Sequence, residues 1–571
     1  MGEFNRLFAA LAAAGCLCAA TSVGAADRSQ ARSMIISQNG IVAAEHPLAS
    51  QAGAAILAGG GNAIDAAIAA NAMMGLVAPM MNGIGGDLFA IVYEAKTGKV
   101  YGLNASGWAP KGLTPEYLKA KGITAMPQTG IDSVTVPGAG AGWDALRTRF
   151  GTKPFAELLA PAISYARNGF PVTEIFGQNW VGSANKLRGN ADSTKVYLPG
   201  GRAPQVGEVF RNSDLAWSYE QIAQDGIDSL YKGAIAERIL KTSAALGGTM
   251  AAEDLAQFEP EWVEPISTTY RGWTVYEMPP NEQGIAALMM LNIMENFPIG
   301  QWGHDSARTL HTDIEAKKLA YADMLRYVAD TRFAKVPVPG MLSKAYAGER
   351  AALIEAGKAN CQVGPGKPPH EGADTTYLST VDKDGNMVSL IQSNFAGFGS
   401  GVTVQDGGFV LHNRGGLFTL EEGHPNVLTG RKRPLHTIIP AFMTNGEKRI
   451  AFGIMGGWNQ AQAHAQFVSN VADFGMNIQA ALEAPRFTKA TFAGCDLEME
   501  ARFPAETRQK LAERGHVITL HDDFSDAFGG GQAVLRDFST GINYGASDPR
   551  KDGAATAEFQ MASPKLKAAA Q

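Results

Sequence analysis

A β-hairpin is predicted for Asp374-Thr375-Thr376-Tyr377-Leu378-Ser379-Thr380-Val381 and the residues that follow it. The β-branched and aromatic residues of this run are typical of a strand. Turn residues follow in Asp382-Lys383-Asp384-Gly385-Asn386, and Met387 to Ser393 is predicted as the returning strand. Residues 338–372, immediately before the hairpin, are rich in Gly, Pro and Lys, which indicates a loop. A new structural unit therefore begins near Asp374.

The chain changes character on the two sides of this hairpin. Helical periodicity dominates before it, in residues 154–168, 283–296 and 305–329. Strand-like runs dominate after it, in residues 407–413, 437–443 and 449–455. We therefore predict an α+β fold in which helices cover the faces of two mostly antiparallel sheets.

The bulk composition is that of a large globular protein. The 571 residues are 45% hydrophobic and 18% charged. This length predicts two domains or one large layered unit. The formal net charge of −6 is small for the length, so it offers no electrostatic argument for binding nucleic acid or an acidic membrane surface.

The N-terminus has the pattern of an export signal. Arg6 precedes an apolar run over residues 7–23, and Val23-Gly24-Ala25 supplies small residues for cleavage. We predict a signal peptide over residues 1–25 and a periplasmic or secreted protein. A second interpretation is lipoprotein attachment at Cys16. No later run is long and uncharged enough to predict a stable membrane span.

Two cysteines remain once the predicted signal peptide is removed. Cys16 and Cys18 lie within that peptide, whereas Cys361 and Cys495 lie in the mature chain. An oxidising compartment would allow them to pair, but the sequence does not show whether they come within bonding distance.

Common catalytic motifs are missing. The chain has no His-Glu-x-x-His helix, no paired cysteine clusters and no Gly-x-Ser-x-Gly nucleophile elbow. The glycine-rich residues 138–142 differ from a dinucleotide-binding loop, since Trp143 stands where the third glycine belongs. We therefore predict no metal and no cofactor.

Thr375 offers a reactive group if the peptide bond before it is broken. An internal threonine hydroxyl is a poor nucleophile because no base is at hand. As an N-terminal residue it carries its own α-amine, with an unperturbed pKa of about 7.7–8.0. That amine can accept the hydroxyl proton near neutral pH. Taken alone, a Thr-Thr pair at the start of a hairpin is also what ordinary strand propensity produces.

Beyond this hairpin, the chain resembles the γ-glutamyltransferase family in an ordered series of segments. The hairpin resembles the family's cleavage site. The N-terminal signature and mid-chain loop are matched by His46-Pro47-Leu48-Ala49, Gly60-Gly61-Asn62-Ala63-Ile64-Asp65-Ala66-Ala67, Pro279-Pro280-Asn281 and Gln283-Gly284. Later segments are Phe398-Gly399-Ser400-Gly401, Lys432-Arg433-Pro434, Met455-Gly456-Gly457 and Gly545-Ala546-Ser547-Asp548-Pro549-Arg550. The resemblance covers nearly the whole mature chain.

This resemblance implies an N-terminal-nucleophile hydrolase with a four-layer αββα fold. The precursor would cut itself between Asp374 and Thr375 into a large fragment, residues 26–374, and a small fragment, residues 375–571, which stay together as a heterodimer. Thr375 would attack an amide carbonyl and form an acyl-enzyme. Gly456 and Gly457 match the positions whose N–H groups hold the oxyanion, and they also fit a tight turn after a strand. Ser393 matches a hydroxyl near the threonine amine, or is an ordinary strand serine.

The chain departs from the family where the glutamate group is held. Residues 104–110 contain no arginine to hold the substrate α-carboxylate. Family residues that grip the α-amine are replaced by Arg414 and Leu417, which predicts a reversed local charge that disfavours a substrate ammonium. A family asparagine becomes Phe395, and paired serines become His436-Thr437.

These replacements predict a rebuilt acyl pocket formed by Arg414, His436, Thr437 and Phe395. Arg414 would bind a carboxylate in two-pronged fashion, unless it is a surface strand arginine. Phe395 and Trp108 would make the pocket more apolar. The short connection over residues 418–432 leaves little room for a lid, which favours water as the acyl acceptor.

Three hypotheses follow for the function. In the first, the enzyme hydrolyses or transfers the acyl group of small γ-glutamyl amides such as glutathione. In the second, the mechanism is the same and the acyl group is dicarboxylic or apolar, without an α-amine. In the third, the chain is a periplasmic binding protein that kept the fold and lost the chemistry; Asp374, Thr375 and the Gly456-Gly457 pair argue against it.

Overall fold

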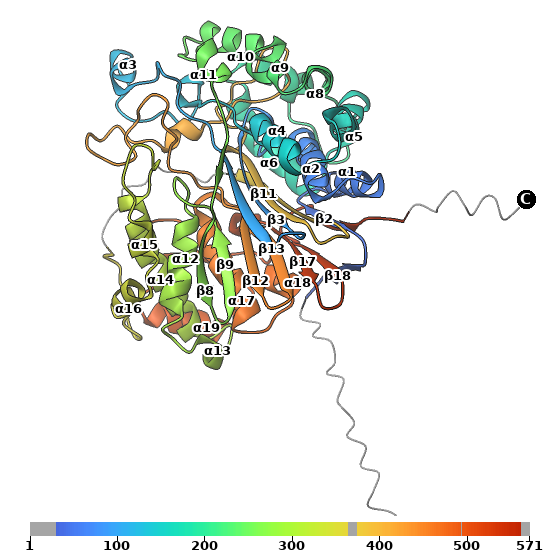
Figure 1. The fold of residues 1–571 in the computed structure, drawn as a ribbon. Coiled ribbons are helices and arrows are strands. Elements are labelled where there is room, and N and C mark those ends of the chain that lie inside the picture. The colour runs from blue at the N-terminus through green and yellow to red at the C-terminus, as the bar shows by residue number, and fades with distance from the viewer. Residues whose placement is uncertain (1–29, 364–373, 493, 561–571) are drawn as a thin grey trace, which may run out of the picture.

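The computed structural model describes residues 30–363, 374–492 and 494–560. The predicted signal peptide and Cys16 lie outside the described residues. Two seven-stranded sheets form the centre of the molecule (Figure 1). Every strand pairing within these two sheets is antiparallel, as predicted.

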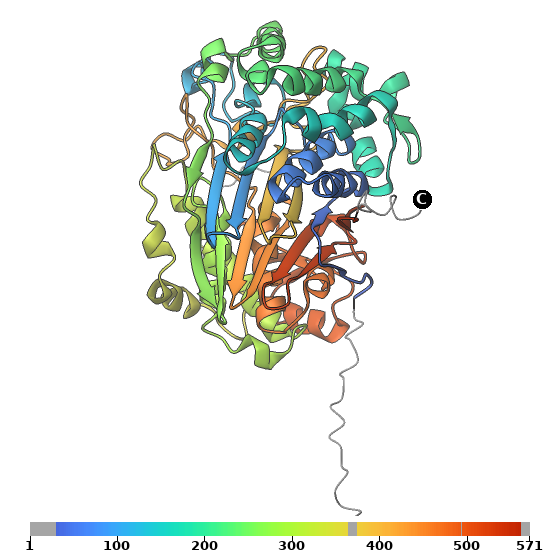
Figure 2. The same cartoon turned by 45° about the vertical axis from the view of Figure 1, so that its right-hand side comes forward.

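The first sheet contains the predicted hairpin. Its strand order is β19 (Ala554–Ala557), β2 (Ile41–Ala44), β10 (Asp374–Val381), β11 (Met387–Phe395), β3 (Asp87–Glu94), β4 (Lys99–Ala105) and β7 (Glu261–Val263). The second sheet runs β1 (Ile35–Ser37), β18 (Ile542–Ser547), β17 (Gly531–Asp537), β13 (Lys448–Ile454), β12 (Ala441–Asn445), β9 (Trp273–Glu277) and β8 (Ile266–Tyr270). Strands from distant parts of the chain therefore alternate across both sheets, as the blue and gold strands of Figure 2 show.

The predicted hairpin is confirmed. β10 and β11 pair from Thr376 opposite Gln392 to Val381 opposite Met387. In the turn, a carboxylate oxygen of Asp382 accepts hydrogen bonds from the backbone N–H groups of Asp384 and Asn386, both at 3.0 Å. Every residue of β11 is buried, because this strand is central in its sheet and covered on both faces.

The period-two alternation of β3 shows how the layers stack. Leu88, Ala90 and Val92 lie in a core shared with the first helical layer. Phe89, Ile91 and Tyr93 point to the opposite face, into a core shared with residues of the second sheet. Alternate side chains of one strand thus fill two different cores, which is expected when both faces of a sheet are covered.

Helices cover the outer face of each sheet. The layer on the first sheet includes α1 (Pro47–Ala58), α2 (Ala63–Val77), α4 (Ala139–Phe150), α5 (Phe155–Asn168), α6 (Glu174–Leu187) and α8 (Ser213–Asp225). The layer on the second sheet includes α12 (Gly284–Met294), α14 (Ala307–Tyr327), α16 (Lys344–Ala351), α17 (Gln460–Ala472) and α18 (Ile478–Glu483). The predicted four-layer αββα sandwich is confirmed (Figure 1).

A smaller sheet lies beside α14. It contains β14 (Phe487–Thr488), β15 (Asp496–Glu500) and β16 (Val517–His521), and α19 (Ala505–Glu513) shares a small core with this sheet and α14. β15 and β16 are parallel, because α19 forms the crossover that connects them.

One predicted strand is wrong. Residues 407–413 are irregular in place of a strand, apart from Val410, which forms an isolated bridge with Thr403. The apolar run that suggested a strand, Phe409-Val410-Leu411, is buried against the first helical layer. The predicted strand over residues 437–443 begins only at Ala441, since Pro440 has no N–H to donate to the sheet.

Cys361 and Cys495, whose pairing the sequence left open, form a disulfide with a Cα–Cα distance of 4.9 Å. Within the described ranges, no helix has both the length and the apolar character needed to span a membrane.

Candidate active site

The predicted nucleophile lies at the beginning of β10. Asp374 is paired with Phe395 and Thr376 with Gln392, so the register shifts at Thr375. On the other side of β11, Ser393 is paired with Asp87, the first residue of β3. The backbones of Thr375, Ser393 and Asp87 therefore lie at the same end of three neighbouring strands.

The start of β10 is anchored by two buried side chains from the N-terminal part of the chain. Asn82 donates a hydrogen bond to the hydroxyl of Thr376 at 2.5 Å. The backbone N–H of Tyr377 donates to a carboxylate oxygen of Glu45 at 2.8 Å. These contacts hold the residues directly after Thr375 in place.

Ser393 lies near the end of β11, and the glycine pair forms a tight turn after β13. The Ser393 hydroxyl accepts a hydrogen bond from the N–H of Phe395 at 2.8 Å. Gly456 and Gly457 follow β13 with φ angles of 130° and 56°, which residues with a Cβ rarely adopt. Gln283 donates to the carbonyl oxygen of Gly457 at 2.7 Å and to that of Thr437.

The backbone N–H groups of Gly456 and Gly457 are not used in hydrogen bonds within the described part of the fold. Asn459 N–H donates to the carbonyl of Gly456 at 2.9 Å, so both glycine carbonyls have donors. Among the described residues, none accepts a hydrogen bond from the N–H of Gly456 or Gly457. Two free N–H groups side by side are the arrangement an oxyanion requires. The turn is confirmed, and the oxyanion role stays a prediction.

A buried carboxylate organises the predicted substrate-binding residues. Asp87 Oδ2 accepts hydrogen bonds from Arg414 Nε at 2.8 Å and from His436 Nε2 at 2.7 Å, and lies 3.2 Å from His412 Nδ1. Arg414 Nη1 donates to the Thr437 hydroxyl at 2.8 Å. All five side chains are 0% exposed. The structure thus brings Arg414, His436 and Thr437 together around a residue that the sequence did not single out.

Phe395 packs against these residues, and Asp87, His412, Arg414, His436, Thr437 and Phe395 are together called the Asp87 cluster. The Arg414 guanidinium carbon lies 4.5 Å from the centre of the Phe395 ring, at a distance typical of a cation–π contact. Trp108, expected beside Phe395, packs instead against Phe258 and Arg431. Its indole N–H donates to the carbonyl of Asp254.

Two predictions about Arg414 need correction. It is no surface strand residue, since it is fully buried in a short 3-10 helix, Arg414–Leu417. The expected charge reversal at this position is offset by Asp87, because the carboxylate balances the guanidinium. The Nε and Nη2 edge of Arg414, at 2.8 and 3.3 Å from Asp87, already makes the two-pronged contact that was expected for a substrate carboxylate.

Electrostatics keep the Asp87 carboxyl ionised and His436 neutral. Burial alone would raise the pKa of Asp87, but Arg414 and His436 overcome it and hold the pKa well below its usual range. Burial, reinforced by the Arg414 charge, lowers the pKa of His436 to about 3. Neutral His436 donates from Nε2, so its Nδ1 bears a lone pair, and this buried atom has no hydrogen-bond partner among the described residues.

Glu282 is a second residue that sequence reasoning missed. It is 0% exposed, and its backbone forms a bridge with His436. Neither carboxyl oxygen has a hydrogen-bond partner among the described residues. Burial, together with Glu277 and Asp87, raises its pKa well above the usual range, which favours the neutral acid. The sequence carried one signal that could have found Asp87 and Glu282, since each is an acidic residue next to an otherwise apolar element.

The sequence of the chain matches a known protein family. A family model described as gamma-glutamyltranspeptidase matches residues 49–558. The chain belongs to this family. It is 38% identical over 526 residues to the glutathione hydrolase-like YwrD proenzyme of Bacillus subtilis (strain 168), an alignment that covers 91% of this chain and 99% of that protein.

Other members carry different names. The oxamate amidohydrolase proenzyme of Klebsiella pneumoniae is 34% identical over 530 residues, with 91% and 98% of the two chains covered. The crystal structure of cephalosporin acylase from Bacillus halodurans matches with a TM-score of 0.87 and 43% identity over 94% of this chain and 99% of that one. The predicted resemblance and the N-terminal-nucleophile hydrolase fold are confirmed, and the chain is an enzyme of this gamma-glutamyltranspeptidase family.

Proposed function

We propose that the chain is a self-cleaving amide hydrolase with Thr375 as its nucleophile. The main support is the position of Thr375 at a register shift at the start of β10, at the same sheet edge as Ser393 and Asp87, in a member of this family. Matching proteins named proenzymes support the cleavage step. The bond that breaks is the peptide bond between Asp374 and Thr375, and one water is consumed.

Cleavage at this bond would leave the fold intact. β10 and β11 belong to the proposed small fragment, residues 375–571, and lie between β2 and β3 of the proposed large fragment, residues 26–374. The second sheet is interleaved in the same way, with β12, β13, β17 and β18 between β1 and β9. Separation of the fragments would break strand ladders in both sheets, so a stable heterodimer is expected.

The reaction then proceeds through an acyl-enzyme. The freed α-amine of Thr375 accepts the proton of its own hydroxyl, and the oxygen attacks the substrate amide carbonyl. The N–H groups of Gly456 and Gly457 stabilise the oxyanion, and each such donor contributes on the order of 2.7–4 kcal/mol to lowering the barrier. The amine leaves with a proton, and water hydrolyses the ester to release the acid.

We propose further that the preferred acyl group carries no α-ammonium. A substrate ammonium needs a carboxylate with free lone pairs, and Asp87 already binds Arg414, His436 and His412. The raised pKa of Glu282 disfavours its charged form, and Leu417 replaces the family acid. Burying an ammonium without a partner is costly. Dicarboxylic or apolar acyl groups therefore fit best, with His436 Nδ1 and the Glu282 carboxyl as candidate polar contacts.

γ-Glutamyl amides such as glutathione remain the second candidate, because the B. subtilis relative is named glutathione hydrolase-like. The test compares p-nitroaniline release from glutaryl and γ-glutamyl p-nitroanilides, which differ only in the α-amino group. We expect kcat/KM to favour the glutaryl compound by about tenfold or more, which corresponds to roughly 1.4 kcal/mol. Thr375→Ala is the inactive control. A preference for the γ-glutamyl compound would overturn the proposed acyl specificity.

We propose export to the periplasm or the exterior, directed by residues 1–25. The disulfide supports this proposal, because disulfides form and persist in oxidising compartments. Mass spectrometry of the purified protein's N-terminus distinguishes cleavage near Ala25 from lipid attachment at Cys16.

A further inference from the structure

The Cys361–Cys495 disulfide spans the proposed cleavage point. Cys361 precedes the bond between Asp374 and Thr375, and Cys495 follows it. The two cysteines are 134 residues apart in sequence. Cys495 is 7% exposed, whereas Cys361 is an exposed residue.

Backbone contacts on both sides of the disulfide join the same two parts of the chain. Gly494 N–H donates to the carbonyl of Cys361 at 3.1 Å, and Ala359 N–H donates to the carbonyl of Arg514 at 2.7 Å. The Arg514 side chain in turn donates to the carbonyl of Ala356 at 3.1 Å. Residues 356–361, near the end of the large fragment, are therefore fastened to the small fragment around β15, α19 and β16.

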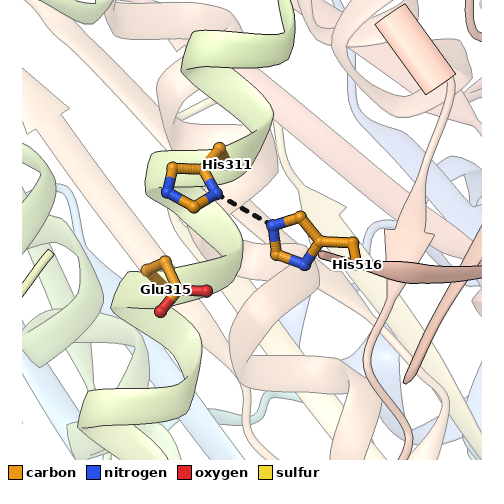
Figure 3. Close-up of side chains that lie close together, drawn as sticks. All are labelled: His311, Glu315 and His516. Carbon is orange, nitrogen blue, oxygen red and sulfur yellow. Dashed lines mark hydrogen bonds between the residues drawn. The ribbon is translucent and has the colours of Figure 1, made fainter. Parts of the chain in front are cut away.

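A polar cluster on α14 positions this segment. Figure 3 shows His311 and Glu315 on one helix, facing His516 from the small fragment. His311 Nε2 lies 2.8 Å from the carbonyl oxygen of Glu355, to which it must donate. His311 Nδ1, the acceptor in the neutral ring, lies 2.8 Å from His516 Nε2. Burial lowers the pKa of both rings, that of His516 to about 3, which is consistent with this neutral pair.

Glu315 holds the residue next to Cys361. One carboxylate oxygen accepts from the backbone N–H of Asn360 at 3.2 Å, and the other accepts from Lys318 Nζ at 2.6 Å. Lys318 also donates to the carbonyl of Asn360 at 3.0 Å and lies 3.9 Å from Cys495 Sγ. The α14 side chains thus hold the segment that presents Cys361 to Cys495.

This His311–Glu315–His516 cluster is better explained by that positioning role than by a metal. One ligand atom from each of the three residues lies within 4.8 Å of the others, a spacing that a cation could bridge. However, the two imidazoles are hydrogen-bonded to each other, and the charge of Glu315 is already balanced by its ion pair with Lys318. Burial is the main cause of the lowered pKa of His516, and the nearby charges of Lys318, Arg514 and Lys489 lower it further. A divalent cation would add to that charge.

We propose that the Cys361–Cys495 disulfide is the covalent link between the two fragments of the mature enzyme. This inference rests on the proposed self-cleavage. The bond forms when the two thiols give up two protons and two electrons to a disulfide oxidant of the exporting compartment. Before cleavage it closes a loop within one chain; after cleavage it prevents the fragments from diffusing apart when the enzyme unfolds.

The test is electrophoresis of denatured, thiol-blocked enzyme with and without reductant. We expect two fragments with reductant and one full-length band without it. Two fragments in both lanes would overturn the link and leave the proposed cleavage standing. One full-length band in both lanes would overturn the cleavage, and the proposed inter-fragment link with it.

Variants sharpen this result. Cys361→Ser replaces an exposed residue, and we expect two fragments without reductant, as for Cys495→Ser. A single non-reduced band from Cys361→Ser would contradict the assignment. If the variant fails to fold, non-reducing tryptic mapping of the wild-type enzyme decides: a peptide pair joining Cys361 to Cys495 supports the link, and free thiols at both positions exclude it.

Discussion

The Asp87 cluster and the His311–Glu315–His516 cluster both join the proposed large and small fragments, yet they do so with different electrostatics. The first is built on a charged pair, Asp87 with Arg414, and Asp87 begins a strand at the same sheet edge as Thr375. The second is built on a neutral imidazole pair beside a disulfide. In the first cluster the buried ion pair itself joins the two fragments, whereas in the second the buried Glu315–Lys318 ion pair lies within α14 and the neutral imidazoles and the disulfide make the connection. We infer that the ion pair between fragments organises the chemistry, and that the second cluster holds the fragments together. Breaking each cluster should therefore have different consequences.

The largest effect is expected from Asp87→Asn. It removes the only charge that directly pairs Arg414 among the described residues, and an uncompensated buried charge costs about 3–5 kcal/mol. Urea unfolding measures the loss, and kcat/KM should fall as well, because Arg414, His436 and Thr437 lose their common partner. Asp144→Asn, which breaks a partly exposed pair with Arg147, is the matched control, with an expected loss of about 0–1 kcal/mol. An Asp87→Asn enzyme as stable and active as wild type would show that the pair organises nothing.

His311→Ala should have a smaller effect, confined to stability. The substitution leaves the Glu355 carbonyl and His516 Nε2 without their partner, at a cost of about 1–3 kcal/mol. The kcat/KM for the preferred anilide should stay at the wild-type value. If the His311→Ala variant is fully folded and its kcat/KM still falls, the two clusters are coupled. The assignment of one cluster to catalysis and the other to holding the fragments together would then be wrong.

Much of the fold could be predicted because its signals are local. The hairpin after Asp374 and the helices α5, α12 and α14 follow from propensity and periodicity over neighbouring residues. The segment 407–413 was mispredicted because a buried apolar loop has the same residue pattern as a buried strand.

The site was only partly predictable, since its partners meet in space and not in sequence. Arg414, His436 and Thr437 were predicted to share a pocket, and the structure brings them together. Asp87 was missed because nothing local links β3 to the segment after β11. The pairing of Cys361 with Cys495 could not be predicted for the same reason.

Acid should destabilise both clusters through their histidines. The pKa of His436 and that of His516 are each lowered to about 3 in the folded protein, against about 6.5 when unfolded. The unfolded state therefore binds more protons below pH 6.5, so stability is full above that pH and falls as the pH drops toward 3. Each histidine contributes at most about 1.4 kcal/mol per pH unit to the slope.

Urea unfolding between pH 6.5 and 4.5 checks this prediction. His436→Gln and His516→Gln should each make the slope shallower by about one proton. An unchanged slope in either variant would mean that the histidine is already charged in the folded protein.

The smallest effect is expected from reduction of the disulfide under native conditions. Because strands of the two fragments alternate in both sheets, the folded enzyme should keep its activity in dithiothreitol. Its unfolding should become dependent on protein concentration, since two separate chains then have to reassociate. Immediate loss of activity on reduction would show that the disulfide supports the active site directly.

The most direct test of self-cleavage at Thr375 is N-terminal sequencing of the small fragment, separated after reduction. We predict a fragment beginning Thr-Thr-Tyr-Leu from the wild-type enzyme and a single uncut chain from Thr375→Ala. A wild-type protein that remains one chain after reduction, or a fragment that begins at any other residue, would contradict it.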